Sequence, residues 1–215
     1  MATLAGCAAG GGGGTSTKSR NLTHVDVSTP VDVQPVQSMP TPVRGDPNAD
    51  VTVMVFEDYA CPHCAHYETE VAPRVVRNYT APGKIRYEHH DFPIPVSKEW
   101  SYAGANAARA VQSAVGDAAF FAYTHTLFAN QQAYVGQGGR GYDYLGTAAQ
   151  SAGASARDVV RAAKGGEYDP VLNADRQRGL KLGLRATPTV YVNGSKTESH
   201  GYDAVSSAID SARSG

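Results

Sequence analysis

Two cysteines, Cys61 and Cys64, lie three positions apart at the junction of a predicted strand and a predicted helix, and this pair constrains the 215-residue chain more than any other feature. Residues 51–56 form a nearly continuous apolar run rich in β-branched side chains, which is typical of a strand covered on both faces. Residues 65–79 carry apolar side chains near helical spacing, and residues 84–90 alternate as a strand does. The cysteines therefore lie where the first strand of a β-α-β unit passes into its helix.

The C-terminal half predicts a helical block followed by a second small sheet unit. Residues 97–183 carry helical periodicity throughout. A strand is predicted at residues 189–192, and Asn193-Gly194 is a strong hairpin-turn dipeptide that leads into a short return strand. Residues 204–212 form a closing amphipathic helix. The predicted order is β-α-β, a helical block, and then β-β-α, which is an α/β fold with an inserted all-helical subdomain.

The composition excludes several classes of protein. The 19 basic and 20 acidic side chains give a net charge of -1, so the chain has no surplus of positive charge for phosphates and no nucleic-acid partner is expected. No apolar run approaches the roughly 20 residues that a membrane helix needs. Three cysteines are too few for a framework of structural disulfides. Stability must come from an apolar core, which leaves Cys61 and Cys64 available for chemistry.

The position of Cys61 at the start of a helix favours redox chemistry. Unpaired amide groups and the helix dipole favour negative charge there, so the thiolate of Cys61 is expected to be stabilised and its pKa lowered. Cys61 is therefore the predicted nucleophile and leaving group, and Cys64, one turn deeper, is predicted to attack Cys61 and release the substrate.

Two other interpretations of the pair remain open. A structural zinc site needs four ligands, and the chain has no second Cys-x-x-Cys motif to complete one. A static structural disulfide is the other. Neither requires the cysteines to react, and we predict neither a metal site nor a cofactor beyond the cysteines themselves.

The motif and several further runs together resemble the DsbA-like thiol-disulfide oxidoreductases of the thioredoxin superfamily. The resemblance covers residues 42–212 and rests on these runs: Phe56-Glu57-Asp58-Tyr59-Ala60-Cys61-Pro62-His63-Cys64, Asp91-Phe92-Pro93-Ile94-Pro95, Leu127-Phe128-Ala129-Asn130-Gln131 and Ala186-Thr187-Pro188-Thr189. It implies a thioredoxin fold of β-α-β and β-β-α halves, with residues 97–183 as a helical insertion covering the active site.

The resemblance also implies roles for residues beyond the two cysteines. Pro188 would follow a cis peptide bond beside the cysteines, and the backbone of Thr187 would then bind an extended substrate peptide. Apart from the resemblance, the position of Pro62 and His63 between the cysteines predicts that they tune the thiolate, since the His63 ring can stabilise it when protonated or as a hydrogen-bond donor. A stabilised thiolate makes the disulfide more oxidising. We therefore expect substrate oxidation rather than reduction.

One position departs from the family pattern. Thioredoxin and DsbA carry a buried acid six residues before the first cysteine, which is thought to help deprotonate the second, and here that position is Val55. Glu57 and Asp58 are expected to point elsewhere or to lie past the strand. The proton acceptor for Cys64 is thus left open.

The N-terminal region predicts a tether and an anchor. Residues 8–41 begin with a glycine run and become rich in proline, which indicates a flexible tether ahead of a domain at residues 42–215. Residues 1–7 end in Leu4-Ala5-Gly6-Cys7, which resembles the lipobox of secreted lipoproteins, where the cysteine is lipidated. Only three residues precede the box, so either the start is truncated or the box is accidental. We expect Cys7 to carry the lipid.

The sequence therefore predicts an extracytoplasmic enzyme that is lipid-anchored to the outer face of the cell membrane and forms disulfides in thiol-containing proteins. A separate redox partner would regenerate its disulfide, and the membrane would be contacted through the lipid only. A reductase or isomerase on the same fold is one alternative. A surface lipoprotein that binds substrates or acts like a chaperone, without turnover of the cysteines, is another.

Overall fold

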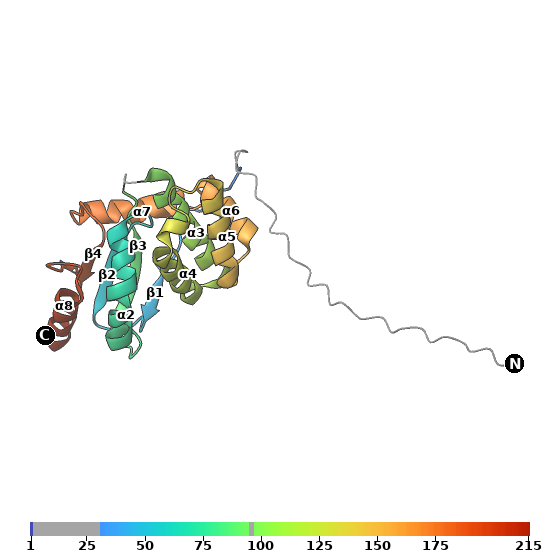
Figure 1. The fold of residues 1–215 in the computed structure, drawn as a ribbon. Coiled ribbons are helices and arrows are strands. Elements are labelled where there is room, and N and C mark those ends of the chain that lie inside the picture. Colours follow the sequence, from blue (N-terminus) through green and yellow to red (C-terminus); the bar gives the residue numbers. More distant parts are fainter. Residues whose placement is uncertain (2–30, 95–96) are drawn as a thin grey trace.

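A five-stranded mixed sheet with the order β1-β3-β2-β4-β5 forms the centre of the domain (Figure 1). This is a computed structural model, which describes residue 1, residues 31–94 and residues 97–215. Only the β2–β3 pair is parallel. The strands are β1 (Val43–Gly45), β2 (Thr52–Glu57), β3 (Arg86–Asp91), β4 (Thr189–Val192) and β5 (Ser195–Lys196).

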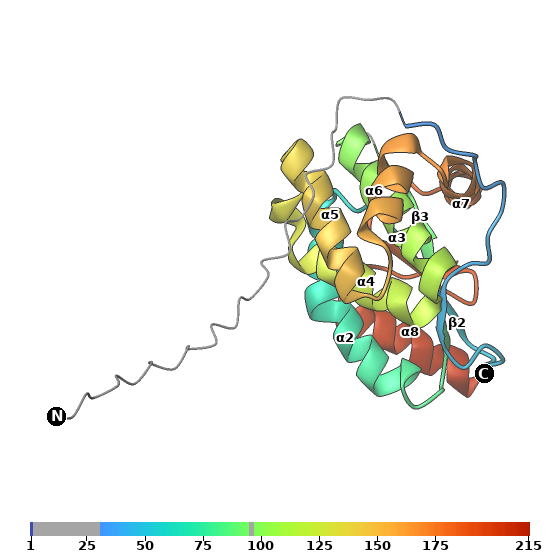
Figure 2. The same ribbon diagram turned by 90° about the vertical axis from the view of Figure 1, so that its right-hand side faces the viewer.

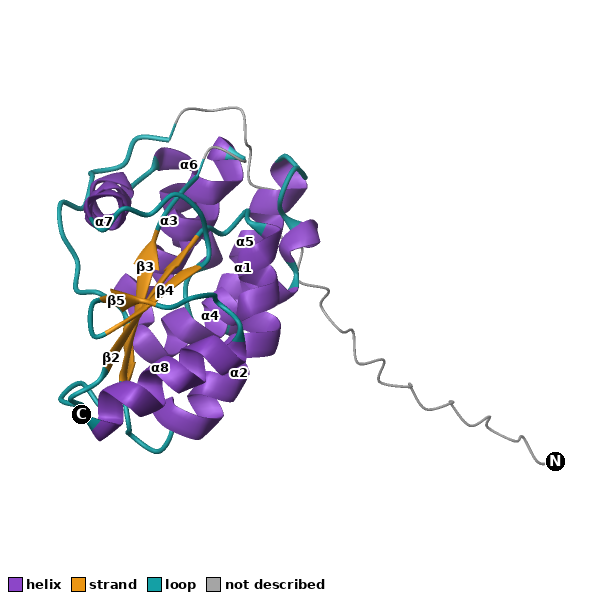
Figure 3. Ribbon diagram, turned by 90° about the vertical axis from the view of Figure 1, so that its left-hand side faces the viewer, coloured by secondary structure: helices purple, strands orange, loops and turns teal. Residues whose placement is uncertain are grey.

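Helices surround this sheet, which is the central layer in Figure 3. Figure 2 shows α3, α4, α5 and α6 gathered into one bundle. The predicted helical insertion at residues 97–183 also contains α7, which packs on the other face of the sheet. The order β-α-β, helical block and β-β-α is confirmed. Within the described residues, no helix is both long and apolar enough to cross a membrane. The helical elements are α1 (Pro62–His66), η1 (Tyr67–Val71), α2 (Ala72–Val75), η2 (Val76–Thr80), α3 (Lys98–Val115), α4 (Asp117–Ala129), η3 (Gln131–Ala133), α5 (Gly139–Ser151), α6 (Ala156–Gly165), α7 (Asp169–Lys181) and α8 (Tyr202–Ser214).

Strand β2 separates two apolar clusters because successive side chains point to opposite faces. Val53 and Val55 belong to the main core, which also contains both active-site cysteines. Met54 and Phe56 belong to a smaller cluster on the other face. Helix α7 closes this second face, where Gly179 approaches Phe56 so closely that an added Cβ would lie 3.3 Å from its ring.

The helix after the cysteines begins earlier than residue 65 and contains two π-helical turns. The first of them, η1, ends just before Pro73, where the sequence predicts a kink. In this wider turn the amide of Ala72 donates to the carbonyl of Tyr67, five residues back. The wider turn also places Glu68 toward the interior, where it is 3% exposed.

The described N-terminal segment lies against the helical bundle. The amide of Val36 donates to the Glu167 carbonyl at 2.7 Å, and the Pro40 carbonyl accepts from Arg109 and Gln112. Strand β1 follows and pairs antiparallel with β3. The sequence does not predict β1, because its three residues carry no alternating apolar pattern.

A buried arginine connects the bundle to the sheet. Arg109 of α3 is 1% exposed and lies 2.7 Å from Asp91 at the end of β3 and 2.6 Å from Asp175 of α7. Asp175 also contacts His90, with its Oδ1 atom 3.1 Å from the ring nitrogen Nδ1. One guanidinium therefore joins two helices of the insertion to the strand next to the active site.

Replacing Arg109 with methionine is expected to destabilise the protein by about 3–5 kcal/mol, because it leaves the carboxylates of Asp91 and Asp175 buried without their cation. Urea unfolding measures this loss. The matched control is Arg157→Met, which removes an exposed ion pair with Asp158 and should change stability by no more than about 0.5 kcal/mol. Equal losses in the two variants would contradict the role given to Arg109.

Candidate active site

Cys61 is the residue that precedes helix α1, and Pro62 is the first residue of that helix. The backbone of Cys61 is extended, with φ -83° and ψ 120°, while its carbonyl accepts from the amides of Cys64 and Ala65. Proline is favoured at the first helical position, where its missing amide proton would have no partner. The sequence therefore places the Cys61 sulfur at the open amides of a helix N-terminus. Both cysteines are buried and reduced.

Asp58 holds the turn between β2 and α1. Its carboxylate accepts from the Ala60 amide at 2.6 Å, from the Ile94 amide at 2.5 Å and from the Ser101 hydroxyl at 2.9 Å. Burial raises the pKa of Asp58 to about 6. Sequence reasoning assigned no role to Asp58. The position could have indicated one, because an aspartate between an apolar strand and a turn commonly accepts hydrogen bonds from nearby backbone amides.

The surroundings of Cys61 stabilise its thiolate. The hydrogen bond from the Cys64 thiol is the largest contribution, and it outweighs burial, which acts in the opposite direction. The Thr187 side chain and the amides of Cys64 and His63 add to it, and together they lower the pKa of Cys61 to about 5. Cys61 is therefore ionised at neutral pH, as expected of a nucleophile at a helix start.

Cys64 lies in the opposite environment. It is 0% exposed within the main core, and burial, followed by the hydrogen bond with Cys61, raises its pKa well above the ordinary thiol value. The amide of Asp58 donates to its sulfur at 3.4 Å. Cys64 therefore keeps its proton until a reaction requires its thiolate.

The Thr187–Pro188 peptide bond is cis, as the resemblance implies. The Cys61 sulfur lies 3.5 Å from the Thr187 carbonyl oxygen, which brings the two distant motifs together. The side-chain amide of Gln131 donates to the carbonyls of Tyr59 and Cys61, and this places the helical insertion beside the motif.

Pro62 and His63 are both exposed at the surface beside the cysteines. The contribution of His63 to the Cys61 thiolate comes from its backbone amide.

A second histidine, His200, is half-buried close to this surface. Burial, and next the charges of His63 and His66, lower the pKa of His200. The sequence gives no sign of His200, because this residue lies in the loop before α8 and matches no motif.

Comparison with known proteins agrees with this geometry. The family model described as Thioredoxin matches residues 37–211. The chain belongs to the thioredoxin family. Its resemblance to the DsbA-like branch is confirmed by relatives and by solved structures.

Disulfide bond formation protein D of Bacillus subtilis is 25% identical over 175 residues, which cover 79% of this chain and 75% of that protein. A relative from Rickettsia conorii is also 25% identical, and the matched region is 59% of its length, so this chain spans about three-fifths of the Rickettsia relative. The crystal structure of oxidised BdbD from Bacillus subtilis has a TM-score of 0.72 at 22% identity, covering 85% of this chain and all of that one. Chlamydia trachomatis DsbA has the same TM-score at 19% identity, covering 86% and 98%. The thioredoxin fold with a helical insertion is therefore confirmed.

The structure places the side chain of Glu57 differently from the expectation in the sequence analysis. Strand β2 continues through Glu57, so this side chain lies on the same face as Val55, where the family acid would be. Glu57 is 1% exposed, and His89 Nδ1 lies 3.3 Å from its Oε2 atom. The expectation that Glu57 points elsewhere was wrong, because the strand is one residue longer than its apolar run.

Two further predictions concern a lipid and a metal. Cys7 lies outside the described residues. Among the residues that the structure describes, no group of three or more His, Cys, Asp or Glu side chains is arranged to hold a metal ion.

Replacing the exposed His63 with valine is expected to raise the Cys61 pKa by about one unit, because the imidazole between the cysteines, which can carry positive charge or donate a hydrogen bond, is lost while the backbone amide remains. One unit corresponds to about 30 mV, so the disulfide should become less oxidising by some tens of millivolts. Ultraviolet absorbance of the thiolate and equilibration in a glutathione buffer measure the two quantities. The control is His66→Val, further along the helix. If His63→Val leaves both quantities unchanged, then the amides and Cys64 stabilise the thiolate alone.

Proposed function

We propose that this chain is a thiol-disulfide oxidoreductase that forms disulfides in extracytoplasmic proteins through Cys61 and Cys64. The observation that carries the proposal is the contrast between two sulfurs one helical turn apart. Cys61 has a pKa lowered to about 5 at a helix start, and Cys64 is buried with a raised pKa. The name of the Bacillus subtilis relative, disulfide bond formation protein D, supports the same activity.

The reaction follows from this contrast. A substrate thiolate attacks Cys61 in the oxidised protein, forms a mixed disulfide and displaces Cys64, which takes up a proton. A second substrate thiolate then attacks the substrate sulfur of the mixed disulfide and displaces Cys61 as a thiolate. The substrate gains a disulfide, and the protein is left with two reduced cysteines. The electrons pass between sulfurs, so we propose no cofactor and no metal.

Thr187 is the proposed backbone contact for the substrate. Its carbonyl lies 3.5 Å from the Cys61 sulfur, so an extended peptide whose cysteine reaches Cys61 passes along this edge. Main-chain hydrogen bonds of this kind tolerate many side chains. We therefore propose thiol-containing proteins in general as substrates.

The lowered pKa of Cys61 favours oxidation over reduction. Its thiolate stabilises the reduced protein fully above the ordinary thiol pKa of 9.0, and this stabilisation decreases as the pH falls and is lost below about 5. A stable reduced form makes the disulfide a stronger oxidant. The reduced protein then needs a separate redox partner that restores its disulfide.

Replacing Cys64 with alanine should trap covalent complexes between Cys61 and substrate proteins, because no second sulfur is left to release them. Replacing Cys61 with alanine should trap none, since Cys64 is fully buried. Non-reducing electrophoresis after incubation with an oxidised, unfolded protein shows the complexes, and added reductant should dissolve them. Equal trapping by both variants would contradict the assigned order of attack, and full turnover without Cys61 would contradict the function.

We also propose that a lipid on Cys7 anchors the protein to the outer face of the membrane. The support is the sequence Leu4-Ala5-Gly6-Cys7 followed by a glycine-rich segment. A lipid on this cysteine would place the redox domain next to a membrane-bound partner without a spanning helix.

Expressed with a complete signal peptide, the protein should partition into detergent, and Cys7→Ser should move it to the aqueous phase, because the acyl chains supply the membrane affinity. Phase partitioning and mass spectrometry of the N-terminal peptide measure the effect. Cys64→Ala is the matched cysteine control and should stay in detergent. An unmodified Cys7 in the wild-type product would refute the anchor.

A further inference from the structure

A closed ring of three hydrogen bonds joins Asp58 to the two cysteines. The Asp58 carbonyl accepts from the Cys61 amide at 3.0 Å, and the Cys61 carbonyl accepts from the Cys64 amide at 3.1 Å. The Asp58 amide closes the ring by donating to the Cys64 sulfur at 3.4 Å. Within the described residues, this is the only hydrogen bond that the sulfur accepts from an amide. The turn before α1 therefore aims one N–H group at a sulfur that has to carry negative charge during disulfide exchange.

The position of this amide is fixed, because the side chain of the same residue is held by three donors. The Asp58 carboxylate accepts from the Ala60 and Ile94 amides and from the Ser101 hydroxyl. These donors belong to the turn before α1, to the loop after β3 and to helix α3. A donor that is already fixed in place stabilises developing charge without a further cost of reorganisation.

The surroundings of Cys64 make such a donor valuable. The side chain lies in the main apolar core at 0% exposure, so bulk water does not solvate its thiolate. Burial is the largest of the effects that raise the pKa of Cys64, and the Asp58 amide acts in the opposite direction. A hydrogen bond to a charged atom is also stronger in an apolar core than in water.

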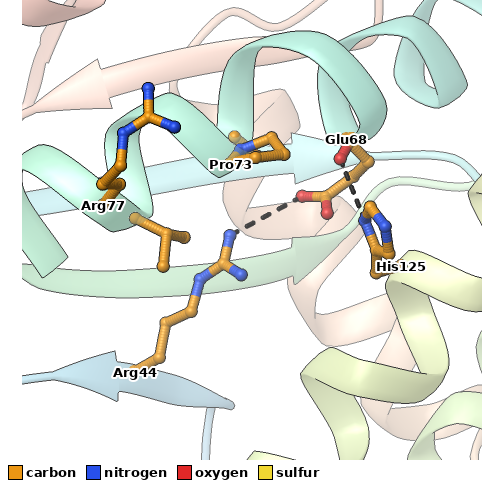
Figure 4. A pocket seen from close by; sticks show the side chains of 7 residues that line it. Arg44, Glu68, Pro73, Arg77 and His125 are labelled. Carbon is orange, nitrogen blue, oxygen red and sulfur yellow. Dashed lines mark hydrogen bonds and ion pairs between the residues drawn. The ribbon is translucent and has the colours of Figure 1, made fainter. Parts of the chain in front are cut away.

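Arg44 and His89, two basic side chains of the sheet, are directed at carboxylates instead. Arg44 lines a cavity of about 280 Å³ whose lining includes neither cysteine, and its Nη2 atom points toward Glu68 at 3.9 Å (Figure 4). The two ring nitrogens of His89 lie 3.3 Å and 3.5 Å from the oxygens of two buried carboxylates. Neither side chain therefore replaces the Asp58 amide as a donor to the Cys64 sulfur.

We propose that the backbone amide of Asp58 is a catalytic group that stabilises negative charge on the Cys64 sulfur during disulfide exchange. The inference rests on the proposed function. When a substrate thiolate attacks Cys61, a bond forms between these two sulfurs, the bond between the cysteines breaks, and its electron pair moves onto Cys64 beside the Asp58 N–H group. In the reverse step the Cys64 thiolate attacks Cys61, and the electron pair leaves on the substrate sulfur. The amide keeps its proton throughout, so it acts as a hydrogen-bond donor and not as an acid.

Replacing the amide of Asp58 with an ester removes this donor and keeps the carboxylate. Asp58→malic acid makes that change, and the full chain is assembled by joining a synthetic thioester segment of residues 1–60 to an expressed segment that begins with Cys61. The reduced protein is mixed with glutathione disulfide, quenched in acid and analysed by mass spectrometry. Attack by Cys61 gives a first phase whose rate rises with the concentration of glutathione disulfide, and release by Cys64 gives a second phase that is independent of it.

The ester should slow the second phase about tenfold, because a donor aimed at charge in the transition state is lost and sulfur is a weaker acceptor than oxygen. Attack of reduced glutathione on the oxidised protein should slow by a similar factor, since Cys64 is the leaving group in that step. The first phase should stay within about twofold of the wild type, because Cys64 is neutral there. An intact first phase also shows that the turn before α1 is folded.

The matched control is the corresponding ester at Asn48, which lies in the same synthetic segment and whose amide donates to Asp46 in an exposed turn. It should change neither phase. A second phase within about twofold of the wild-type rate in the Asp58 ester would overturn the proposal. Equal slowing of both phases would also overturn it, because the amide would then serve the geometry of the turn and not the charge on Cys64. Absence of the first phase in the wild-type protein would instead refute the proposed function.

Discussion

The buried carboxylate of Asp58 is the constraint on which the reacting geometry depends. By accepting hydrogen bonds from the Ala60 and Ile94 amides and the Ser101 hydroxyl, it fixes the turn before α1, the loop after β3 and helix α3 to one another. Only with this turn held does Cys61 meet the open amides of α1. Because burial raises the pKa of Asp58, its ionisation costs stability as the pH rises through about 6, and the three donors offset that cost.

The different reactivities of the two sulfurs then follow from one helical turn. At the helix start, the Cys61 thiolate meets amide groups and the Cys64 thiol, and its pKa falls. One turn deeper, Cys64 meets the main apolar core and the charge of Glu57, and its pKa rises. The helical insertion contributes by closing the site, since Gln131 holds the carbonyl of Cys61.

The sequence predicts the fold well wherever local patterns decide it. The β-branched run, the helical periodicity and the Asn193-Gly194 turn, where both residues have positive φ, all have direct structural counterparts. The proximity of Cys61 and Thr187 is also predicted from the sequence, although only through the resemblance to a known family. Two features that the sequence does not predict depend on contacts between distant residues. Strand β1 forms because β3 offers a free edge. Arg109 pairs with carboxylates that are 18 and 66 residues away in the sequence. Helical periodicity places Arg109 on α3 but says nothing about which carboxylates it meets.

The buried acid of this chain lies two residues further along β2 than the acid of the family, but on the same face of the strand. Side chains two residues apart lie on the same face of a strand, so the carboxylate that the family carries at the position of Val55 can be supplied by Glu57. The move shifts it by about 7 Å along β2, toward the carboxyl end where the active-site turn begins. There the carboxylate lies beside the buried His89 ring, whose Nδ1 atom is 3.3 Å from Glu57 Oε2. In this chain the buried acid therefore lies at the end of β2 beside the ring of His89, because the strand runs one residue past its apolar run.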